Sequence, residues 1–413
     1  MAKDRVITGI DIGTHYTYTV VCSLNSELPS PQVIGLGRVR SFGLRRGSII
    51  DVNEAAEAVK ASVKEAENSS GVVISKAFVS IGGSHIVAVP SQGVVAVSRA
   101  DGEISHDDVE RVLAAAQQVA FPRNKQILHA FPNEYVVDGE YGLHDVVGMN
   151  GMRLEANTLL VGAASNQIRS VDHVLEQNNI EADGYVLTPL ASSKAVLSRR
   201  QKELGVLCLD IGGGTTDIAV FEEGHLIHTN VLPLGGDNIT NDLAIVLRTN
   251  VDVAERVKRE YGMALSHELN KRETIDLSKF DTNEKGTVQR KDVVEIMEAR
   301  LGEIFDLVNK DLKRIGKEAF LPGGVVLVGG TAKVPLIVDL CKQRLRLPVQ
   351  IGFPRDVEGI VGSVDDPSYA TVLGLIFWAV EQGGYRGGTV LPNMPSLNYS
   401  VDRARRWLRA FLP

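Results

Sequence analysis

The sequence predicts an α/β protein made of two similar halves that meet at a shared cleft. Three stretches carry this prediction: Val6 to Leu24, Leu204 to Leu226, and Val325 to Ala332. The first two each run from an apolar strand to an aspartate, through a glycine turn and into a second strand. The third is a buried type of strand that enters a glycine turn and then a helix near Val334. A repeated strand–turn–strand unit indicates an internal duplication.

The second unit, LGVLCLDIGGGTTDIAVFEEGHL, has the composition of a phosphate-binding turn. Its first strand ends at Asp210, and the turn that follows contains Gly212, Gly213, Gly214, Thr215 and Thr216. Successive glycines let the backbone approach a ligand and direct several N–H groups to one point, which suits a phosphate. The threonines add hydroxyl donors, and Asp210 can hold Mg²⁺ through water. A glycine-rich hairpin without a ligand is the alternative.

The first unit, VITGIDIGTHYTYTVVCSL, repeats the pattern near the start of the chain. Asp11 takes the place of Asp210, and Gly13 and Thr14 form the turn. The two aspartates are 199 residues apart (210 − 11). We therefore expect each half to present one hairpin to the shared cleft, with the glycine turn after Val328 lying against a nucleotide base or ribose.

Length and composition agree with a soluble protein of two domains. The 413 residues can bury two cores, and 44% hydrophobic with 23% charged residues is ordinary for a globular chain. The net charge of −7 argues against nucleic acid as the main partner. Cys22, Cys208 and Cys341 are interpreted as reduced core residues of a cytoplasmic protein. No signal peptide is evident, and the most apolar run, Ala370 to Val380, is too short to cross a bilayer.

The pattern changes between Ser84 and Gly162, where the sequence predicts a compact β-α-β insertion. Ile86 to Val97 is interpreted as a hairpin, a capped helix begins at Ser105, and Asn124 to Val137 and Arg153 to Val161 are strands. The region has no phosphate motif of its own. The histidines near or within it are His85, His106, His129 and His144, and their spacing predicts structural or surface roles rather than a metal site.

The second half contains a charged helix, Asp252 to Tyr261, with two possible roles. Its Glu255 and Lys258 either face solvent, as charged helix faces usually do, or hold the base and ribose of a nucleotide. The polar loop Leu265 to Gly286 and the long helix Lys291 to Lys310 are expected to belong to a mobile or partner-facing lobe.

The C-terminal stretch differs from the rest of the chain. Residues 381–399 are rich in Gly, Pro, Ser and Asn and read as a flexible linker. The pattern of residues 400–413 predicts an amphipathic helix whose apolar face and basic side include Arg403, Arg406, Trp407, Leu408, Arg409, Phe411 and Leu412. A basic amphipathic helix with aromatic residues predicts an anchor on anionic lipid. A helix that docks on the protein's own body is the alternative.

Several segments together resemble the FtsA family of bacterial cell-division proteins, within the actin-like ATPase superfamily. They are GIDIGTHYT, ISHDDVERVLAAAQ, ILHAFPNEYVVDG, DIGGGTTDIAVF, LGGDNITNDLA, VLVGGTAKVP and the terminal helix, so the resemblance covers the whole chain. It implies an actin-like, duplicated ribonuclease H-like fold. The first subdomain would comprise residues 1–83 and 163–190, the insertion 84–162, and the second half 191–380 with an upper lobe at about 235–322.

The resemblance also implies a function at the division site. Such a protein binds ATP with Mg²⁺, polymerises, and tethers FtsZ filaments to the inner face of the cytoplasmic membrane through the FtsZ C-terminal peptide. It also contacts other division proteins. Carried over by motif, the nucleotide-binding residues are Asp11, Gly13, Thr14, His15, Tyr16, Asp210, Gly212, Gly213, Gly214, Thr215, Thr216, Gly235, Gly236, Glu255, Lys258, Gly329, Gly330 and Thr331. Asp11 and Asp210 would hold Mg²⁺ through water.

One position departs from related ATPases. Chaperones of the DnaK type begin the helix after the second cleft strand with Glu-Pro, whereas this chain has Thr188 before Pro189. Threonine is a poor general base, so at most slow hydrolysis is expected, with ATP acting mainly as a structural ligand. A DnaK-like ATPase is disfavoured because no substrate domain follows residue 380. A pilus-assembly relative with the same fold is the closer alternative, although this tail is not expected in it.

Overall fold

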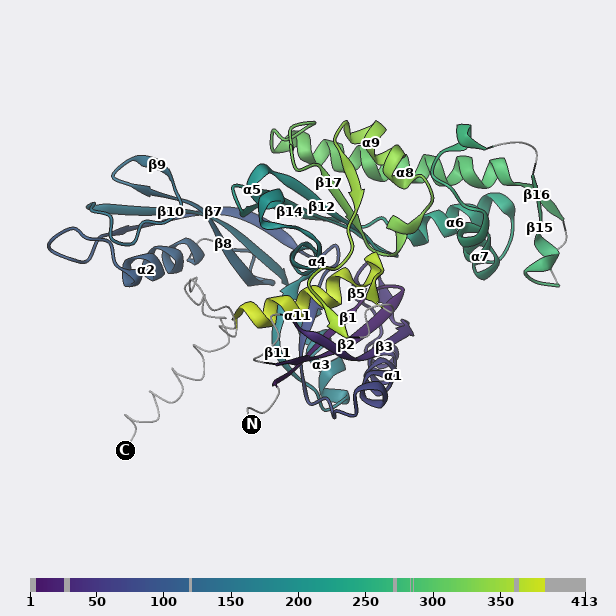
Figure 1. Cartoon of the computed structure of the whole chain (residues 1–413), viewed down its shortest axis with the longest axis horizontal. Helices are drawn as coiled ribbons and strands as arrows, with labels where there is room; N and C mark the ends of the chain where they lie inside the picture. The colour runs from purple at the N-terminus through teal and green to yellow at the C-terminus, as the bar shows by residue number, and fades with distance from the viewer. Residues whose placement is uncertain are drawn as a thin grey trace.

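Two sheets, an inserted subdomain and a helical lobe make up the protein in this computed structural model. It describes residues 5–25, 30–118, 121–269, 273–282, 284, 286–359 and 364–382. The inserted subdomain projects to one side of the second sheet and the lobe to the other, while the first sheet lies below (Figure 1). The predicted linker, apart from Glu381 and Gln382, and the predicted tail lie outside the described residues.

The first half is built on a six-stranded sheet of order β11-β6-β1-β2-β3-β19. Its strands are β1 (Arg5–Ile12), β2 (Tyr16–Leu24), β3 (Gln32–Arg40), β6 (Lys76–Ile81), β11 (Glu181–Leu187) and β19 (Glu358–Gly359). Helices α1 (Val52–Ser70) and α3 (Ser165–Gln177) contribute to the core of this half, and β4 (Leu44–Arg45) and β5 (Ser48–Ile49) form a small hairpin. Asp51 caps α1 by accepting from the backbone N–H groups of Asn53 and Glu54.

The second half repeats this arrangement in a five-stranded sheet of order β14-β13-β12-β17-β18. Its elements are β12 (Val206–Ile211), β13 (Thr216–Glu222), β14 (His225–Leu232), β17 (Val325–Val328), β18 (Val349–Ile351), α4 (Thr188–Val196), α5 (Arg199–Leu204) and α9 (Ile337–Leu345). In each half the first hairpin strand pairs antiparallel with the second and parallel with a later strand. The predicted duplication is therefore a duplication of sheet topology.

The insertion is a four-stranded sheet of order β7-β10-β8-β9 covered by one helix. It contains β7 (Val87–Ala96), α2 (His106–Gln117), β8 (Lys125–Val137), β9 (Glu140–Leu143) and β10 (Arg153–Ala164). The predicted hairpin at Ile86 to Val97 is wrong, because β7 is one strand paired with β10 along its length. Pro90 is tolerated on this edge strand. Gly93 marks a close approach of α2, since a Cβ there would lie 2.0 Å from the carbonyl oxygen of Val112.

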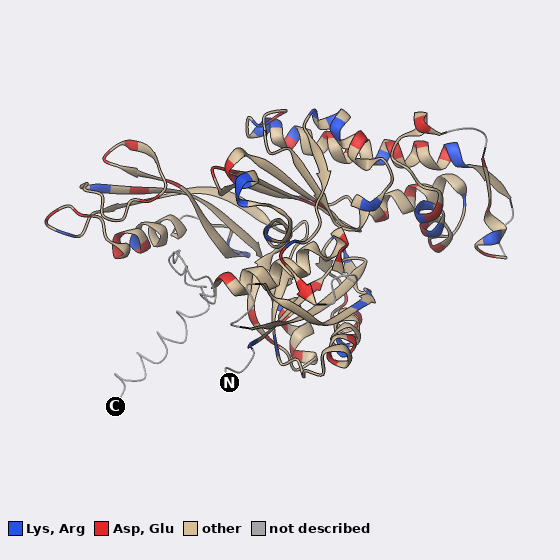
Figure 2. Ribbon diagram, in the orientation of Figure 1, with Lys and Arg blue, Asp and Glu red and all other residues tan. Residues whose placement is uncertain are grey.

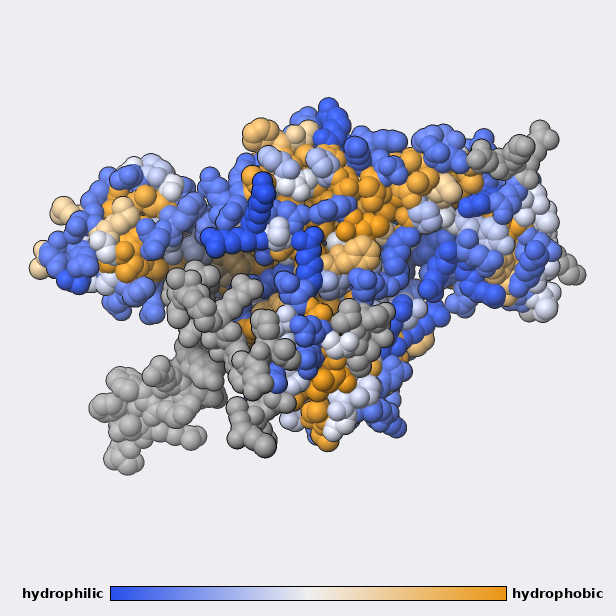
Figure 3. Space-filling view, in the orientation of Figure 1, coloured by the Kyte–Doolittle hydropathy of each residue, from blue (hydrophilic) through white to orange (hydrophobic). Residues whose placement is uncertain are grey.

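The lobe consists of α6 (Gly236–Leu247), α7 (Val251–Tyr261), α8 (Arg290–Arg314) and the short strands β15 (Thr274–Asp276) and β16 (Thr287–Gln289). Lys, Arg, Asp and Glu are dense on its helices (Figure 2). On the face shown in Figure 3, hydrophilic residues cover the lobe, whereas apolar residues are exposed on the second half beside it. Its buried side chains, such as Phe305 of α8, belong to the core of the second half.

Helix α11 (Ala370–Gln382) lies between the halves and completes their joint core. It packs on α4 and on β1, where Gly9 and Gly374 permit backbone contact: a Cβ on Gly374 would lie 1.8 Å from the carbonyl oxygen of Ala191. The apolar run at Ala370 to Val380 is thus a buried helix. The three cysteines are free and buried, as predicted. Within the described ranges, no helix is both long and apolar enough to span a membrane.

Candidate functional site

A cavity of about 330 Å³ lies between the two halves, and both glycine hairpins line it. Fifteen of the predicted site residues line this cavity: Asp11, Gly13, Thr14, His15, Tyr16, Asp210, Gly212, Gly213, Thr215, Gly236, Glu255, Lys258, Gly329, Gly330 and Thr331. They come from five separate stretches of the chain. A volume of this size falls at the lower end of the range for small-molecule sites.

The three remaining predicted residues, Gly214, Thr216 and Gly235, lie beside the cavity without lining it. Thr216 is buried and donates its hydroxyl to the carbonyl of Leu234 at 2.8 Å. Gly235 lets the backbone pass over the glycine loop, because a Cβ there would lie 2.5 Å from the carbonyl oxygen of Gly213. These two residues shape the loop rather than face a ligand.

The two hairpins have the same turn and touch each other. In the first, the Gly13 N–H donates to the carbonyl of Tyr16 at 3.2 Å, and in the second the Gly212 N–H donates to that of Thr215 at 2.9 Å. A Cβ on Gly214 would lie 2.8 Å from Thr14 Oγ1. The hairpins therefore meet closely enough to enclose one chain of phosphates between their backbones.

Three aspartates converge at this end of the cavity: Asp11, Asp210 and Asp217. Burial raises the pKa of Asp11 to about 7, with a further contribution from the charge of Asp210 and an opposing hydrogen bond from Ser80. Burial likewise raises the pKa of Asp210 to about 6, while Thr371, which donates to it at 3.0 Å, acts in the opposite direction. Such carboxylates need a cation to be charged together at neutral pH.

Asp217 was missed by the sequence analysis. It is the strand partner of Asp210, so both side chains lie on one face of the β12–β13 hairpin. Its Oδ2 accepts from Thr215 at 3.1 Å, whereas its Oδ1 is buried and has no hydrogen-bond partner within the described part of the chain. Burial, and then the charge of Asp210, raises its pKa well above the usual value. Only the pairing of the two aspartates could have identified it.

The buried carboxylates fit a hydrated Mg²⁺. The described residues include no group of three or more His, Cys, Asp or Glu side chains placed to ligate one ion directly. Mg²⁺ usually keeps several waters, so one or two carboxylates suffice when they act through those waters. The unpartnered Oδ1 of Asp217 is an acceptor of the kind that a metal-bound water would satisfy.

Glu255 and Lys258, which also line the cavity, form part of a compact polar cluster. Their side chains are 2.5 Å apart, and Lys258 Nζ also donates to Thr240 Oγ1 at 2.7 Å and to the carbonyl of Gly236 at 3.1 Å. Both side chains are largely buried, at 19% and 12% exposure. They do not lie on a solvated face, which was the simpler alternative.

The glycine turn after β17 closes the cavity. Gly329 has φ +86°, and a Cβ there would lie 2.4 Å from Asp210 Oδ1, so only glycine fits. Thr331 donates to the carbonyl of Gly212 at 3.0 Å, which ties this turn to the second hairpin. The helix predicted near Val334 begins later, at Ile337, after the 3₁₀ turn Gly330–Lys333.

Further lining residues were missed because they are ordinary strand and loop residues in the sequence. Arg38 of β3 lies 4.1 Å from the ring centre of Tyr16, and its Nε is buried without a partner among the described residues. Asp237 at the start of α6 and His15 form a pair at 3.2 Å across the cleft. No short motif marks Arg38 or Asp237 as a site residue. Thr188, which the sequence analysis had singled out before Pro189, also lines the cavity.

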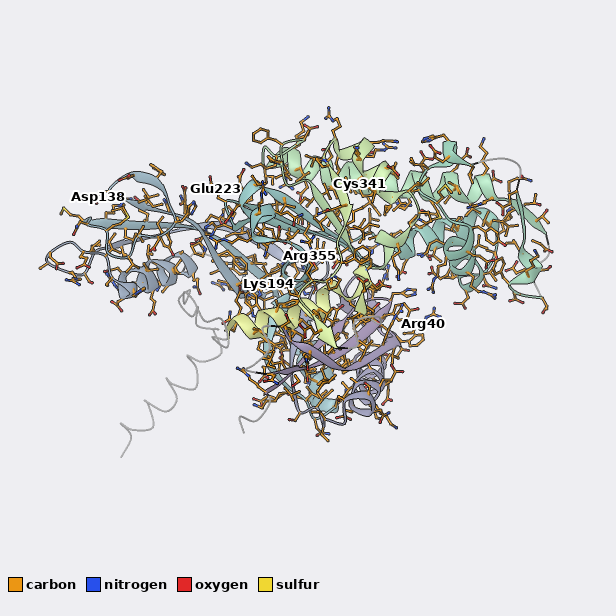
Figure 4. The ribbon with its side chains drawn as sticks, in the orientation of Figure 1. Arg40, Asp138, Lys194, Glu223, Cys341 and Arg355 are labelled. Carbon is orange, nitrogen blue, oxygen red and sulfur yellow. The ribbon has the colours of Figure 1, made fainter. Side chains whose placement is uncertain are left out.

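The histidines of the insertion have structural surroundings. His129 is partly buried, accepts the Leu187 N–H at 3.2 Å and contacts Trp378 of α11 edge to face. Burial lowers its pKa to about 4, so it is neutral. His144 stacks on His225 at the point where the insertion meets the second half, close to the labelled Glu223 (Figure 4).

Two glycine hairpins facing one cavity between duplicated sheets define an actin-like ATPase fold. Solved structures agree: the PilM-PilN type IV pilus biogenesis complex matches with a TM-score of 0.66 at 17% identity, covering 91% of this chain and 98% of that one. MreB5 of Spiroplasma citri bound to ADP matches with a TM-score of 0.54 at 13% identity, covering 91% and 96%.

Sequence comparisons identify the family. The model of "Cell division protein FtsA" matches residues 207–374, and that of the "SHS2 domain inserted in FTSA" matches residues 83–162. The Pseudomonas aeruginosa cell division protein FtsA is 35% identical over 98% of both chains. The Bacillus subtilis relative is 37% identical over 96% of this chain and 88% of its own, and the Escherichia coli relative 30% over 99% of both. The chain belongs to the FtsA family of cell-division proteins.

Proposed function

We propose that this FtsA-family protein binds ATP with Mg²⁺ in the cavity between its halves, polymerises, and tethers FtsZ filaments to the cytoplasmic membrane. The observation that carries the nucleotide part is the pair of glycine hairpins that line one cavity together with Asp11, the buried Asp210 and Asp217, and the Glu255–Lys258 cluster. A phosphate chain needs backbone donors and a cation, and a ribose needs polar groups. The lining of the cavity offers both kinds of group, so it fits a nucleotide.

The chain's own residues would act by binding and orienting the ligand. The hairpin N–H groups and Thr14 would face phosphate oxygens, while Asp11 and Asp210 would hold the waters of the cation. Mg²⁺ supplies charge neutralisation for the phosphates when bound. Thr188 lies where related chaperones carry glutamate, and a hydroxyl cannot accept a proton efficiently at neutral pH. Hydrolysis would therefore be slow, and the nucleotide would chiefly hold the halves together.

The tethering part rests on the family and on the sequence of the C-terminal tail. The tail's Arg403, Arg406, Trp407, Leu408, Arg409, Phe411 and Leu412 have the composition of an interfacial anchor on anionic lipid. In this proposal the second-half lobe contacts the FtsZ C-terminal peptide, and the insertion contacts a neighbouring protomer and other division proteins. The protein would then be peripheral on the inner face of the membrane at the division site.

Co-sedimentation with anionic liposomes, with and without ATP and FtsZ, tests the whole proposal. We expect the protein to pellet with liposomes, FtsZ to pellet only when the protein is present, and ATP to increase both. Failure of FtsZ to pellet beside bound protein would contradict the tether. Calorimetry with ATP and Mg²⁺ tests the cavity separately, and absence of binding would contradict the nucleotide part.

A further inference from the structure

His15 and Asp237 are joined across the cleft, although they belong to different halves. His15 lies in the turn between β1 and β2, and Asp237 lies in the first turn of α6. The Nδ1–H of His15 donates to Asp237 Oδ1 at 3.2 Å. Both side chains line the cavity and are partly buried, at 26% and 37% exposure. The contact is therefore part of the site rather than of the outer surface.

The pair lies directly over the central glycine of the second hairpin. A Cβ on Gly213 would lie 3.0 Å from His15 Cβ and 3.2 Å from either carboxylate oxygen of Asp237. The backbone of Asp237 cannot move independently of this loop, because its N–H donates to the carbonyl of Gly213 at 2.8 Å. Asp237 is thus held by the second half at one place, and His15 reaches it from the first half.

The electrostatics of Asp237 favour this contact. Burial raises the pKa of its carboxyl, but the hydrogen bond and charge of His15, followed by the charges of Lys258 and Arg40, outweigh burial, and the net pKa is lowered. A charged Asp237 beside a phosphate loop would repel an anionic ligand unless a partner covered it. His15 is that partner, since it donates directly to the carboxylate.

We propose that Asp237 is a positioning residue that holds His15 across the phosphate end of the cleft, so that the pair must break before nucleotide leaves. This inference rests on the nucleotide site proposed above and adds a control on exchange at that site. The cavity is lined by both halves, and a ligand between them escapes when they separate. A hydrogen bond that joins the halves beside the phosphate loops opposes that separation.

A second cross-cleft pair provides the matched control. Arg40 at the end of β3 and Asp252 of α7 are 3.5 Å apart, and their side chains are 57% and 80% exposed. Arg40 is labelled in Figure 4 on the first half, below the lobe that carries α7. An exposed, long ion pair contributes little compared with a partly buried one. Arg40→Ala therefore removes a cross-cleft charge without removing the proposed contact.

The test is the release of a fluorescent ADP analogue, mant-ADP with Mg²⁺, from the full chain, chased with excess ADP in a stopped-flow instrument. His15→Ala and Asp237→Ala are each expected to speed release about tenfold, the scale of one charge-assisted hydrogen bond that is partly solvated. The double variant should release no faster than the single ones, because each change removes the same contact. Asp237→Asn keeps an acceptor and should restore slow release in part, and Arg40→Ala should change it less than twofold.

The outcomes separate this inference from the proposed function. If the natural protein does not bind mant-ADP, the nucleotide site itself is contradicted. If it binds but the single variants release it at the natural rate, or the double variant shows two independent effects, Asp237 does not position His15. Thermal unfolding without nucleotide checks folding. Should an alanine variant unfold, His15→Phe and Asp237→Leu, which keep bulk but cannot form the hydrogen bond, replace it with the same expected faster release and the same overturning result.

Discussion

Asp210 and Asp217 are register partners on β12 and β13, so their carboxylates lie side by side on the cavity face of the second hairpin. Both are buried, at 7% and 3% exposure, and Asp11 of the first hairpin interacts electrostatically with each of them. Three acidic groups in one buried region are stable only when some are protonated or when a cation is present. The stability of the protein should therefore depend on pH and on a bound cation.

The stability of the protein in EDTA should fall as pH rises from about 4 to 7. Burial raises the pKa of Asp11 from its ordinary value of 3.8 to about 7 in the folded protein, so the folded state binds more protons than the unfolded state in this window. Asp11→Asn should remove much of this loss of stability with rising pH. Each 1 kcal/mol relieved at pH 7.5 should raise the melting temperature by ~2–4 °C.

Thermal unfolding at pH 5 and pH 7.5 measures this effect, with Asp107→Asn on the exposed side of α2 as the control. Mg²⁺ should stabilise the natural protein more at pH 7.5 than at pH 5, since binding favours the charged carboxylates. An equal effect of Asp11→Asn at both pH values would contradict a raised pKa at this residue.

Gly213→Asp should abolish ATP binding. The Cβ of any side chain at this position would lie 3.2 Å from the carboxylate oxygens of Asp237, and the added carboxylate would occupy the space proposed for phosphates. Calorimetry measures the loss. Ala114→Asp adds the same charge at an exposed position of α2, and it should leave affinity unchanged. Unaltered affinity in the Gly213 variant would place the site elsewhere.

ATP turnover by the purified protein should be slower than about 0.1 s⁻¹, some hundredfold below the median enzyme, because Thr188 is a poor base. Thr188→Glu should raise kcat at least tenfold, whereas Thr188→Gln, of the same size but without a basic oxygen, should not. A phosphate-release assay under saturating ATP measures both. A natural rate near 10 s⁻¹ would show that another group performs this role.

Trp407→Glu should release the protein from anionic liposomes while ATP binding stays intact. The substitution places a charge on the apolar face of the tail, where burial of each large side chain contributes about 1.5–3 kcal/mol when complete. Flotation assays measure binding, with Asn398→Glu in the linker as a control of equal charge change. A Trp407 variant that still floats under polymerising conditions would favour the alternative in which the tail docks on the protein body.

Membrane attachment should also depend on assembly. One tail is a weak anchor, because ordering a helix costs about 1–2 kcal/mol per residue and offsets much of the gain from burial. A polymer presents many tails, and linked binding can raise avidity by about 10²–10⁴. ATP should therefore strengthen flotation of the natural protein but not of Gly213→Asp. Equal flotation with and without ATP would contradict the link between assembly and attachment.

The duplicated fold was predictable because its signal is local. Each hairpin carries its own aspartate, glycine turn and apolar strands, and these recur at one spacing. The order of strands within the sheets could not be predicted, because parallel neighbours such as β12 and β17 are far apart in the chain. The error at β7 has a similar cause, because Pro90 and Gly93 are residue types that suggest a turn. In the folded structure Pro90 lies on an edge strand and Gly93 lies close to α2, and neither fact can be read from the sequence.

The site residues that could be predicted are likewise those whose signal is local in the sequence. Gly13, Gly212 and Gly213 were identified because a phosphate turn is contiguous in sequence. Asp217 looks like any polar residue on a strand, and Asp237 looks like an acid in a helix's first turn, which is favourable for the helix alone. Strand pairing places Asp217 beside Asp210, and the other half of the molecule places His15 beside Asp237. Neither neighbour can be read from the local sequence.

Helix α11 has one end at the cleft and the other at the root of the insertion. Thr371 in its first turn donates to Asp210, and Trp378, nearly two turns later, contacts His129 of β8. Gly9 and Gly374 seat it against backbone on both sides, leaving no room for sliding. A rigid helix with contacts at both ends couples the two places: any tilt at Thr371 would also displace Trp378, and with it the base of the insertion.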